Sequence, residues 1–194
     1  MIQPVERLAR AALAAPLLLL LGAASARQVG QDQPIYDPAA DARAAVSRAT
    51  EVATKKHKRV LVVFGHDASE GHAELYTVLK SGKTDRWPFY YEYELVAVDA
   101  GADGAKNAEL AEALGAGPGS AAPRLTVLDA AGKPLANRVA SEFRGDAGWD
   151  EAKLGRFLAP HAVEPLDAED VLKSALARAA AQDARVFVHL GAPW

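Results

Sequence analysis

The feature that most constrains the fold is an alanine-rich helical segment followed by an apolar strand, a unit that the sequence contains twice. The strand occupies residues 59–65 in the first copy and residues 185–191 in the second. A shift of 126 residues aligns the copies with eight identities over 25 ungapped pairs, from Asp41/Asp167 to Gly65/Gly191. This period exceeds the roughly 20–50 residues of solenoid repeats and suits a duplicated domain. We therefore expect one whole domain, residues 41–162, and the start of a second, truncated one, residues 163–194.

The first 26 residues have the pattern of a secretory signal peptide. Arg7 and Arg10 form a basic region, residues 11–24 are apolar, and Ala24-Ser25-Ala26 fits a small-residue cleavage site. The apolar run of 14 residues is short for a membrane span, which needs roughly 20. We expect export to the periplasm or secretion, with membrane association only if this segment is retained.

Composition excludes several function classes. The chain has no cysteine, although an exported protein can form disulfides, so its 194 residues offer no thiolate nucleophile, disulfide or cysteine metal ligand. The formal net charge of −3 gives no basis for binding nucleic acid or an anionic membrane surface. The small-residue stretch 115–122 lacks the lysine of a phosphate loop. We expect no cofactor.

Between these termini, helical and strand patterns alternate. Residues 27–40 are polar, contain glycine and prolines, and indicate a linker. The continuous apolar run 60–64 is typical of a strand covered on both faces. Strand–helix alternation followed by a late hairpin predicts a mixed sheet between helices. The pattern predicts helices from Asp41 and over 70–79, 106–114 and 149–158, and strands over 60–64, 91–98, 124–128 and 134–140.

The order and spacing of these elements resemble the thioredoxin superfamily, in particular its exported thioredoxin-like members. Four features carry the resemblance: the strand 60–64 that runs into a turn and a helix, the strand that ends in Val98-Asp99, Pro123 just before the strand 124–128, and the hairpin sequence 128–133. The resemblance covers roughly residues 41–160 and implies an α/β three-layer sandwich, with a mixed central sheet and helices on both faces. It also implies a cis bond between Ala122 and Pro123.

The active-site position of the family is altered in this chain. Redox-active members carry Trp-Cys-x-x-Cys between the first apolar strand and its helix, whereas this sequence reads Ala68-Ser69-Glu70-Gly71-His72. Ser69 takes the place of the attacking cysteine and His72 that of the resolving one. A serine hydroxyl is too weak an acid for a helix dipole to ionise, and it cannot form a mixed disulfide. We expect Ser69 to be the N-cap of a helix that starts at Glu70, and no thiol–disulfide oxidoreductase activity.

The second copy differs from the first at this position. Gly191-Ala192-Pro193-Trp194 resembles the segment that precedes the family's cysteine motif, with Trp194 in the tryptophan position. The next residue would be the expected cysteine. A strand without partners is not a complete domain, so we expect a longer natural product. A fragment, a gene-calling error and a selenocysteine codon read as a stop are the alternatives.

Two functions follow from these patterns. In the first, the domain is a binding or scaffolding module that presents a groove beside Ala122 and Pro123 to an extended peptide or protein partner, while any redox activity belongs to a missing C-terminal domain. In the second, the polar side chains near the turn make the domain a divalent-metal binder or a non-redox enzyme. The candidate ligands are His66, Asp67, Glu70 and His72.

Overall fold

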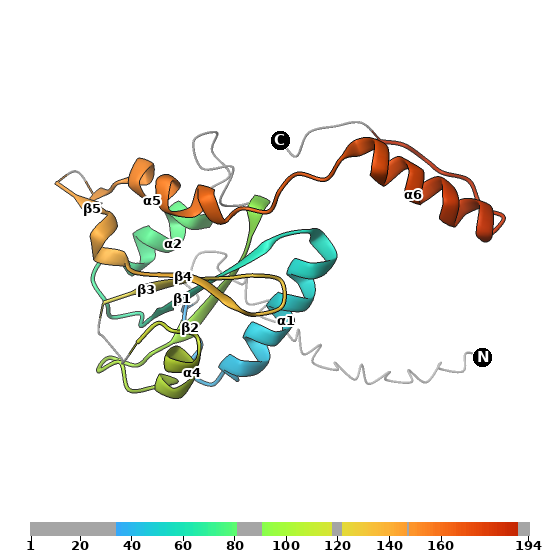
Figure 1. The fold of residues 1–194 in the computed structure, drawn as a ribbon. Helices are drawn as coiled ribbons and strands as arrows, with labels where there is room; N and C mark the ends of the chain where they lie inside the picture. Colours follow the sequence, from blue (N-terminus) through green and yellow to red (C-terminus); the bar gives the residue numbers. More distant parts are fainter. Residues whose placement is uncertain (1–33, 81–90, 118–121, 147, 190–194) are drawn as a thin grey trace, which may run out of the picture. The chain divides into compact units, whose positions relative to one another are not determined.

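The computed structural model describes residues 34–80, 91–117, 122–146 and 148–189 (Figure 1). The predicted signal peptide, the first half of the predicted linker (residues 27–33) and residues 190–194, which include Trp194, lie outside the described residues. Within the described ranges, no helix is long and apolar enough to cross a membrane.

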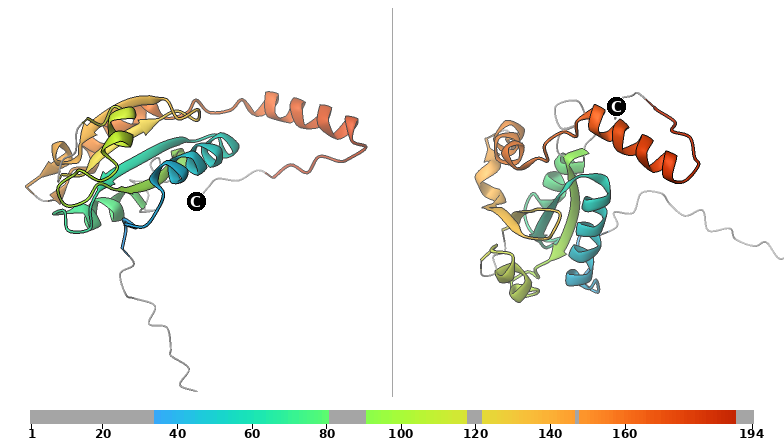
Figure 2. Two further views of the ribbon diagram at one scale, coloured as in Figure 1. Left: turned by 90° about the horizontal axis from the view of Figure 1, so that it is seen from below. Right: turned by 45° about the vertical axis from the view of Figure 1, so that its right-hand side comes forward.

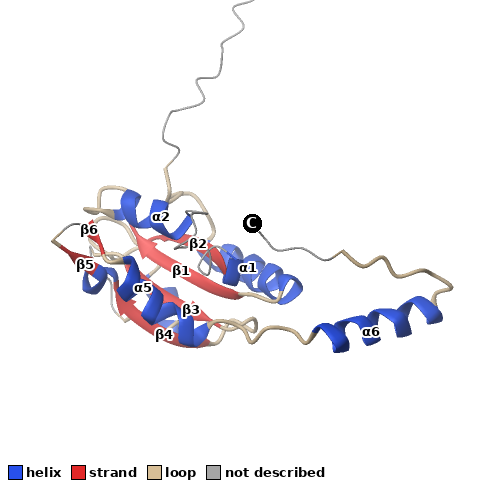
Figure 3. Ribbon diagram, turned by 90° about the horizontal axis from the view of Figure 1, so that it is seen from above, coloured by secondary structure: helices blue, strands red, loops and turns tan. Residues whose placement is uncertain are grey.

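A four-stranded mixed sheet forms the centre of the domain (Figure 3). The strand order is β2-β1-β3-β4, with β1 parallel to β2, and with the pairs β1–β3 and β3–β4 antiparallel. The prediction of a mixed sheet is confirmed, and so is the central position of the most apolar strand. The strands are β1 (Arg59–Gly65), β2 (Tyr93–Asp99), β3 (Arg124–Leu128) and β4 (Pro134–Val139).

Helices cover both faces of the sheet, as the sequence predicts (Figure 2). Alternate residues of β1 point to opposite faces, so Val62 packs with α1 (Ala42–Lys56) and α4 (Ala108–Ala113). Val63 packs on the other face with α2 (His72–Lys80) and α5 (Glu151–Leu158). Both side chains are almost completely buried, which explains why this strand carries a continuous apolar run rather than an alternating one.

Capping interactions fix both ends of α1. The Asp41 carboxylate accepts a hydrogen bond from the Ala44 backbone N–H at 3.0 Å, so the helix starts where the sequence predicts. At the other end, His57 adopts a left-handed conformation with φ of 54°, and the Lys58 N–H bonds to the Ala53 carbonyl at 2.8 Å. The chain then turns directly into β1.

The segment after β4 departs from the predicted order. A short 3₁₀ helix, η2 (Ala140–Phe143), leads into the paired strands β5 (Arg144–Gly145) and β6 (Gly148–Trp149). The predicted helix 149–158 begins two residues later than expected, at Glu151, because the Asp150 carboxylate caps it by accepting from the Lys153 N–H at 2.9 Å. Trp149 therefore lies on a strand instead of in a helix.

The bond between Ala122 and Pro123 is trans, so the predicted cis bond is wrong; no cis peptide bond occurs among the described residues. Trans is the isomer that an X–Pro bond favours by about 0.5–1 kcal/mol in the absence of tertiary constraints. The Pro123 carbonyl accepts a hydrogen bond from the Ala140 N–H at 2.7 Å. This bond extends the β3–β4 ladder by one step and fixes the position of Pro123.

The second copy of the repeat forms a helix without a strand. α6 (Ala168–Ala181) is N-capped by Asp167, whose carboxylate accepts from the Glu169 and Asp170 N–H groups at 2.8 and 3.0 Å. None of its residues is buried, and of the predicted strand 186–190, the described part has no strand structure. Large apolar side chains therefore remain exposed: Val171, Leu172, Leu176, Phe187 and Val188.

Candidate functional site

The altered active-site position lies in a tight turn after β1. The Ser69 N–H bonds to the His66 carbonyl at 2.8 Å, and the His72 N–H bonds to the Ser69 carbonyl at 3.3 Å. Gly71 has a φ of +73°, which breaks the helical conformation, and α2 begins only at His72. The prediction of Ser69 as the N-cap of a helix starting at Glu70 is therefore wrong: Gly71, whose carbonyl accepts from the Leu75 N–H at 3.0 Å, precedes the helix.

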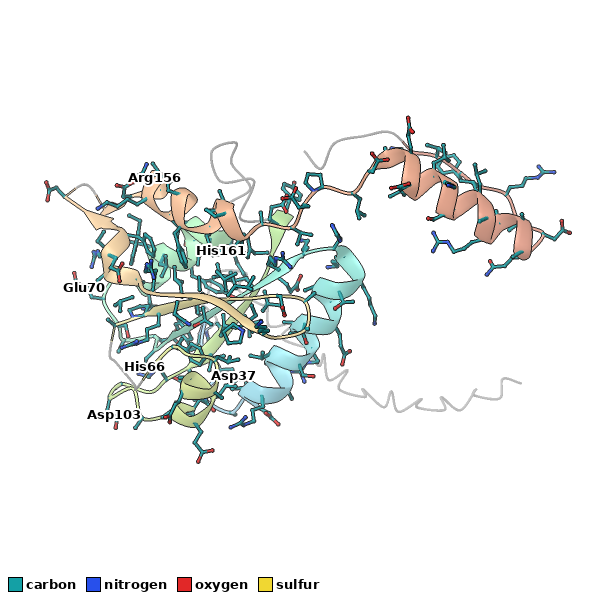
Figure 4. The ribbon with its side chains drawn as sticks, in the orientation of Figure 1. Asp37, His66, Glu70, Asp103, Arg156 and His161 are labelled. Atoms are coloured by element: carbon teal, nitrogen blue, oxygen red, sulfur yellow. The ribbon has the colours of Figure 1, made fainter. Side chains whose placement is uncertain are left out.

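A cavity of about 410 Å³ opens beside this turn. It brings together residues from four separate parts of the chain: the turn after β1, the loop after β2, the residues before β3, and the η2–β6 segment. Sequence patterns pointed to the turn after β1 and to the residues before β3, but not to the other two parts. Figure 4 shows His66 and Glu70 at the same end of the sheet. The lining residues are His66, Ala68, Ser69, Glu70, Ala102, Ala122, Pro123, Ser141, Arg144 and Trp149.

The Arg144 guanidinium forms one wall of the cavity. It lies over the Trp149 ring, 5.4 Å from the ring centroid, and its Nη1 donates to Glu70 Oε1 at 3.1 Å. A Cβ on Gly71 would lie 3.2 Å from Trp149 Cζ2 and 3.3 Å from Arg144 Cζ, so the turn packs closely against both side chains. Glycine is therefore favoured at position 71 for two reasons: it adopts the left-handed φ without strain, and it leaves room for the Arg144 and Trp149 side chains.

A buried ionic network lies behind the turn. The Asp99 side chain is 4% exposed; its Oδ1 is 3.1 Å from His66 Nδ1, and its Oδ2 accepts from Lys106 Nζ at 2.8 Å. Burial raises the pKa of Asp99, but hydrogen bonds from Lys106, the Gly101 N–H and His66 outweigh it, so that the pKa lies below its ordinary value. The carboxylate is therefore charged and orients the His66 ring at the cavity.

A second polar group anchors the segment before α1. Asp67 Oδ1 accepts from the Ile35 and Tyr36 N–H groups at 3.1 and 3.4 Å and lies 3.5 Å from His72 Nε2. This places the Tyr36 ring under the turn, 5.8 Å from the His72 ring. Burial raises the pKa of Tyr36 above its ordinary range. Asp67 and His72 thus hold the N-terminal segment against the domain.

The structure separates the predicted metal ligands into different pairs. His66 faces Asp99, His72 faces Asp67, and Glu70 faces Arg144. In the described ranges, no group of three or more histidine, aspartate or glutamate side chains is placed to hold a metal ion. Proximity in the sequence does not bring these side chains to one point, because the turn and Gly71 direct them to different neighbours.

Sequence reasoning did not assign Ala102, Ser141, Arg144 or Trp149 to the site, and the last two form its wall. Arg144 and Trp149 both lie in the segment 140–149, which forms η2, β5 and β6 and carries no recognisable sequence motif. Their proximity to the turn depends on contacts between residues more than 70 positions apart, as in the Arg144–Glu70 bond. The one signal that could have suggested a binding site here is the closeness of Trp149 to Arg144 in the sequence, because arginine side chains often pack over aromatic rings.

Comparison with known proteins supports the fold. No protein-family model and no curated protein matches the sequence. Among solved structures, the chain is similar to a disulphide isomerase from Xylella fastidiosa Temecula1, with a TM-score of 0.50 and 23% identity, over 63% of this chain and 95% of that one. The chain therefore has a thioredoxin-like fold, as the sequence resemblance implies, and its lack of cysteine fits a redox-inactive domain.

Proposed function

We propose that this chain, with its thioredoxin-like fold, is a binding module for an extended peptide or protein partner and has no thiol–disulfide activity of its own. The observation that carries the proposal is the cavity beside Ser69 and Pro123, which has a prearranged wall of Arg144 and Trp149. A cavity built from four separate segments around a position without a nucleophilic thiol favours recognition over redox catalysis.

The chemistry at the two altered positions supports redox inactivity. A dithiol mechanism needs a thiolate and a resolving thiol, and Ser69 and His72 supply neither. The His72 Nδ1 lies 2.6 Å from the Ser69 carbonyl oxygen, so its ring is held within the turn. An insulin-reduction assay tests this part. We expect no turnover above the no-enzyme control, and turnover that scales with the chain concentration would contradict it.

Binding at the cavity is testable by two-dimensional NMR with a pool of random nine-residue peptides. We expect chemical-shift changes for the backbone amides of Ser69, Glu70 and Arg144. Ala102 lines the cavity, and Ala102→Trp, whose larger side chain would fill part of it, should abolish the changes. Ala131→Trp, an exposed position in the β3–β4 turn, is the matched control and should leave them intact. Binding elsewhere, or unaffected by Ala102→Trp, would contradict the proposal.

We also propose export. The basic region, apolar run and cleavage site in residues 1–26 support it. Fusion of residues 1–33 to a reporter that is active only outside the cytoplasm should give reporter activity. Replacing Leu18, Leu19 and Leu20 with aspartate should abolish that activity, because the apolar region is then lost. An unchanged signal from this variant would refute the assignment.

We propose that residues 163–194 belong to a second unit of the same fold. The helix caps support this, because they repeat at the same 126-residue spacing. Asp41 and Asp167 both cap a helix start, and His57 and Asp183 both have positive φ, 54° and 48°. The bond from Lys58 N–H to the Ala53 carbonyl at 2.8 Å has its counterpart in Ala184 and Ala179 at 2.9 Å.

The buried face of α1 also has an apolar counterpart on α6. The buried Ala42, Val46, Ala49 and Ala53 correspond, at the same spacing, to Ala168, Leu172, Ala175 and Ala179. A face of this kind is stable when a sheet covers it. Transcript sequencing across the codons after Trp194 tests the proposal. A frame that continues into further thioredoxin-like strands supports it, and one that does not continue contradicts it. A cysteine or selenocysteine there would assign the redox activity to that unit.

A non-redox enzymatic function is the second candidate, and the pair of His66 and Asp99 favours it. His66 lines the cavity while its Nδ1 faces a buried carboxylate, an arrangement that suits a general base. Hydrolysis of p-nitrophenyl acetate tests this candidate. Activity lost in His66→Gln but kept in His161→Gln would support it, and rates equal to the buffer control would exclude ester hydrolysis. Metal analysis of the purified chain tests the metal-binding variant of this candidate.

A further inference from the structure

We propose that Arg144 binds a carboxylate of the peptide partner, so that the cavity prefers an acidic peptide, through either a glutamate or aspartate side chain or a free C-terminus. This inference rests on the proposed binding function and specifies its ligand chemistry.

The backbone at Pro123 contributes little to recognition. Proline has no N–H to donate, and the Pro123 carbonyl already accepts from the Ala140 N–H at 2.7 Å. An extended peptide therefore cannot add to the sheet at this residue by a ladder of main-chain hydrogen bonds. Specific recognition at the cavity must come mainly from the side chains that line it.

Among the described residues, three ionisable side chains line the cavity: His66, Glu70 and Arg144. His66 Nδ1 is occupied by Asp99, and Asp99 is itself neutralised by Lys106 at 2.8 Å. Arg144 is therefore the permanent positive charge of the lining. The guanidinium is planar and offers several N–H donors in a fork that matches a carboxylate in two-point geometry.

Packing holds the guanidinium in place before any ligand arrives. It stacks on the Trp149 ring at 5.4 Å and lies against Gly71, and its strand β5 pairs with β6. The Arg144 side chain is only 35% exposed. A donor group that is already ordered loses less conformational freedom on binding, so more of the interaction appears as affinity.

The present partner of Arg144 is weakly held. Glu70 makes one contact to Nη1 at 3.1 Å, and its side chain is 89% exposed. Ion pairs with so much solvent access add little stability, because water competes for both charges. A ligand carboxylate within the cavity would meet the same guanidinium with less water around it. Glu70 thus acts as a substitute ligand that an incoming carboxylate displaces.

The test measures the affinity of the full chain for matched nine-residue peptides by fluorescence anisotropy. One peptide is alanine and serine with a central glutamate, the second has glutamine there, and both are amidated. A third has the glutamine with a free C-terminus. We expect the glutamate peptide, the free C-terminal peptide or both to bind roughly tenfold or more tightly than the neutral peptide, as expected for a charge-assisted two-point contact. Which one does so identifies the source of the carboxylate.

Three variants separate this role from a structural one. Arg144→Gln should abolish the preference for the carboxylate, and Arg144→Lys should keep only part of it, because lysine retains the charge without the fork. Glu70→Gln should tighten binding of the acidic peptide several-fold by removing the competing carboxylate, an effect that damage to the fold would not produce. Arg138→Gln, a half-exposed arginine that does not line the cavity, is the control and should change nothing.

The outcomes distinguish the inference from the proposed function. Equal affinity for the acidic and neutral peptides, with binding still abolished by Ala102→Trp, would overturn the carboxylate inference and leave the binding module intact. Unchanged discrimination in Arg144→Gln would also overturn it. No binding of any peptide at millimolar concentration would overturn both proposals.

Discussion

Replacing Tyr36 and Tyr93 by phenylalanine, one at a time, should change the free energy of unfolding in opposite directions. Both side chains are buried, 2% and 4% exposed. The Tyr93 hydroxyl donates to the Leu158 carbonyl at 2.6 Å, whereas the Tyr36 hydroxyl is buried with no hydrogen-bond partner in the described part of the chain. The same substitution therefore removes a hydrogen bond at one site and an unsatisfied polar group at the other.

The magnitudes follow from the cost of a buried polar group. Tyr93→Phe leaves the Leu158 carbonyl without this donor and should lower the free energy of unfolding by about 1–3 kcal/mol. Tyr36→Phe removes a desolvated hydroxyl that receives no compensation and should raise it by about 1 kcal/mol. Neither change alters the packed ring, so cavity formation does not confuse the comparison.

Urea denaturation followed by circular dichroism gives both values. The two variants should share the wild-type m-value, so that the difference appears as a shift in the midpoint. A loss of more than about 0.5 kcal/mol in Tyr36→Phe, beyond the range of neutral substitutions, would show that this hydroxyl has a partner and that the reasoning is wrong. A neutral Tyr93→Phe would equally contradict the hydrogen bond to Leu158.

Three further predictions use the same denaturation assay. Gly65→Ala would place a Cβ 2.5 Å from the Tyr36 hydroxyl and should lower the free energy of unfolding by about 1–3 kcal/mol. In the control Gly145→Ala, the added Cβ has no contact closer than 3.9 Å and should change the free energy of unfolding by less than about 0.5 kcal/mol. Equal effects would contradict the packing under the turn. Hydrogen bonds outweigh burial and lower the pKa of Asp99, so the charged carboxylate should stabilise the fold above its unfolded pKa of roughly 3.9, and this stabilisation should be lost as the pH falls through the folded pKa. Asp99→Asn should therefore flatten the plot of unfolding free energy against pH in that acid range. An unchanged slope would refute this. Val46→Asp places a charge in the core and should unfold the domain. Leu172→Asp, at the corresponding repeat position on the exposed α6, should leave the stability of the domain unchanged and reduce self-association, as measured by light scattering. A comparable loss of stability in both variants would mean that α6 is covered.

Short-range signals in the sequence determined most of the elements. The continuous apolar run of β1 predicted a strand covered on both faces, and the helical pattern from Asp41 predicted the start of α1. The hairpin turn between β3 and β4 was equally readable, because Asp129 accepts from the Ala131 and Lys133 N–H groups at 2.9 and 2.8 Å within five residues of chain. Periodicity, caps and turns act between neighbouring residues, so a single sequence contains the information that they need.

The sequence also located the altered active-site position, but not its surroundings. The lack of cysteine and the identities of Ser69 and His72 decide what chemistry is absent, and no tertiary contact can change that. By contrast, the cap assigned to Ser69 and the cis bond before Pro123 were wrong. The left-handed Gly71 delays the start of α2 to His72, and the Ala122–Pro123 bond is trans.

Only the tertiary structure decided which side chains face the cavity. His66 meets Asp99 across 33 positions, and Arg144 meets Glu70 across 74. Of the four predicted metal ligands, Asp67 and His72 face each other, whereas His66 faces Asp99 and Glu70 faces Arg144. Such pairings depend on strand order and on how the chain returns after β4, which no periodic pattern specifies. The sequence by itself determined the sheet, its covering helices and the missing thiols. Long-range packing alone placed Arg144, with its guanidinium over the Trp149 ring, against the turn at Gly71.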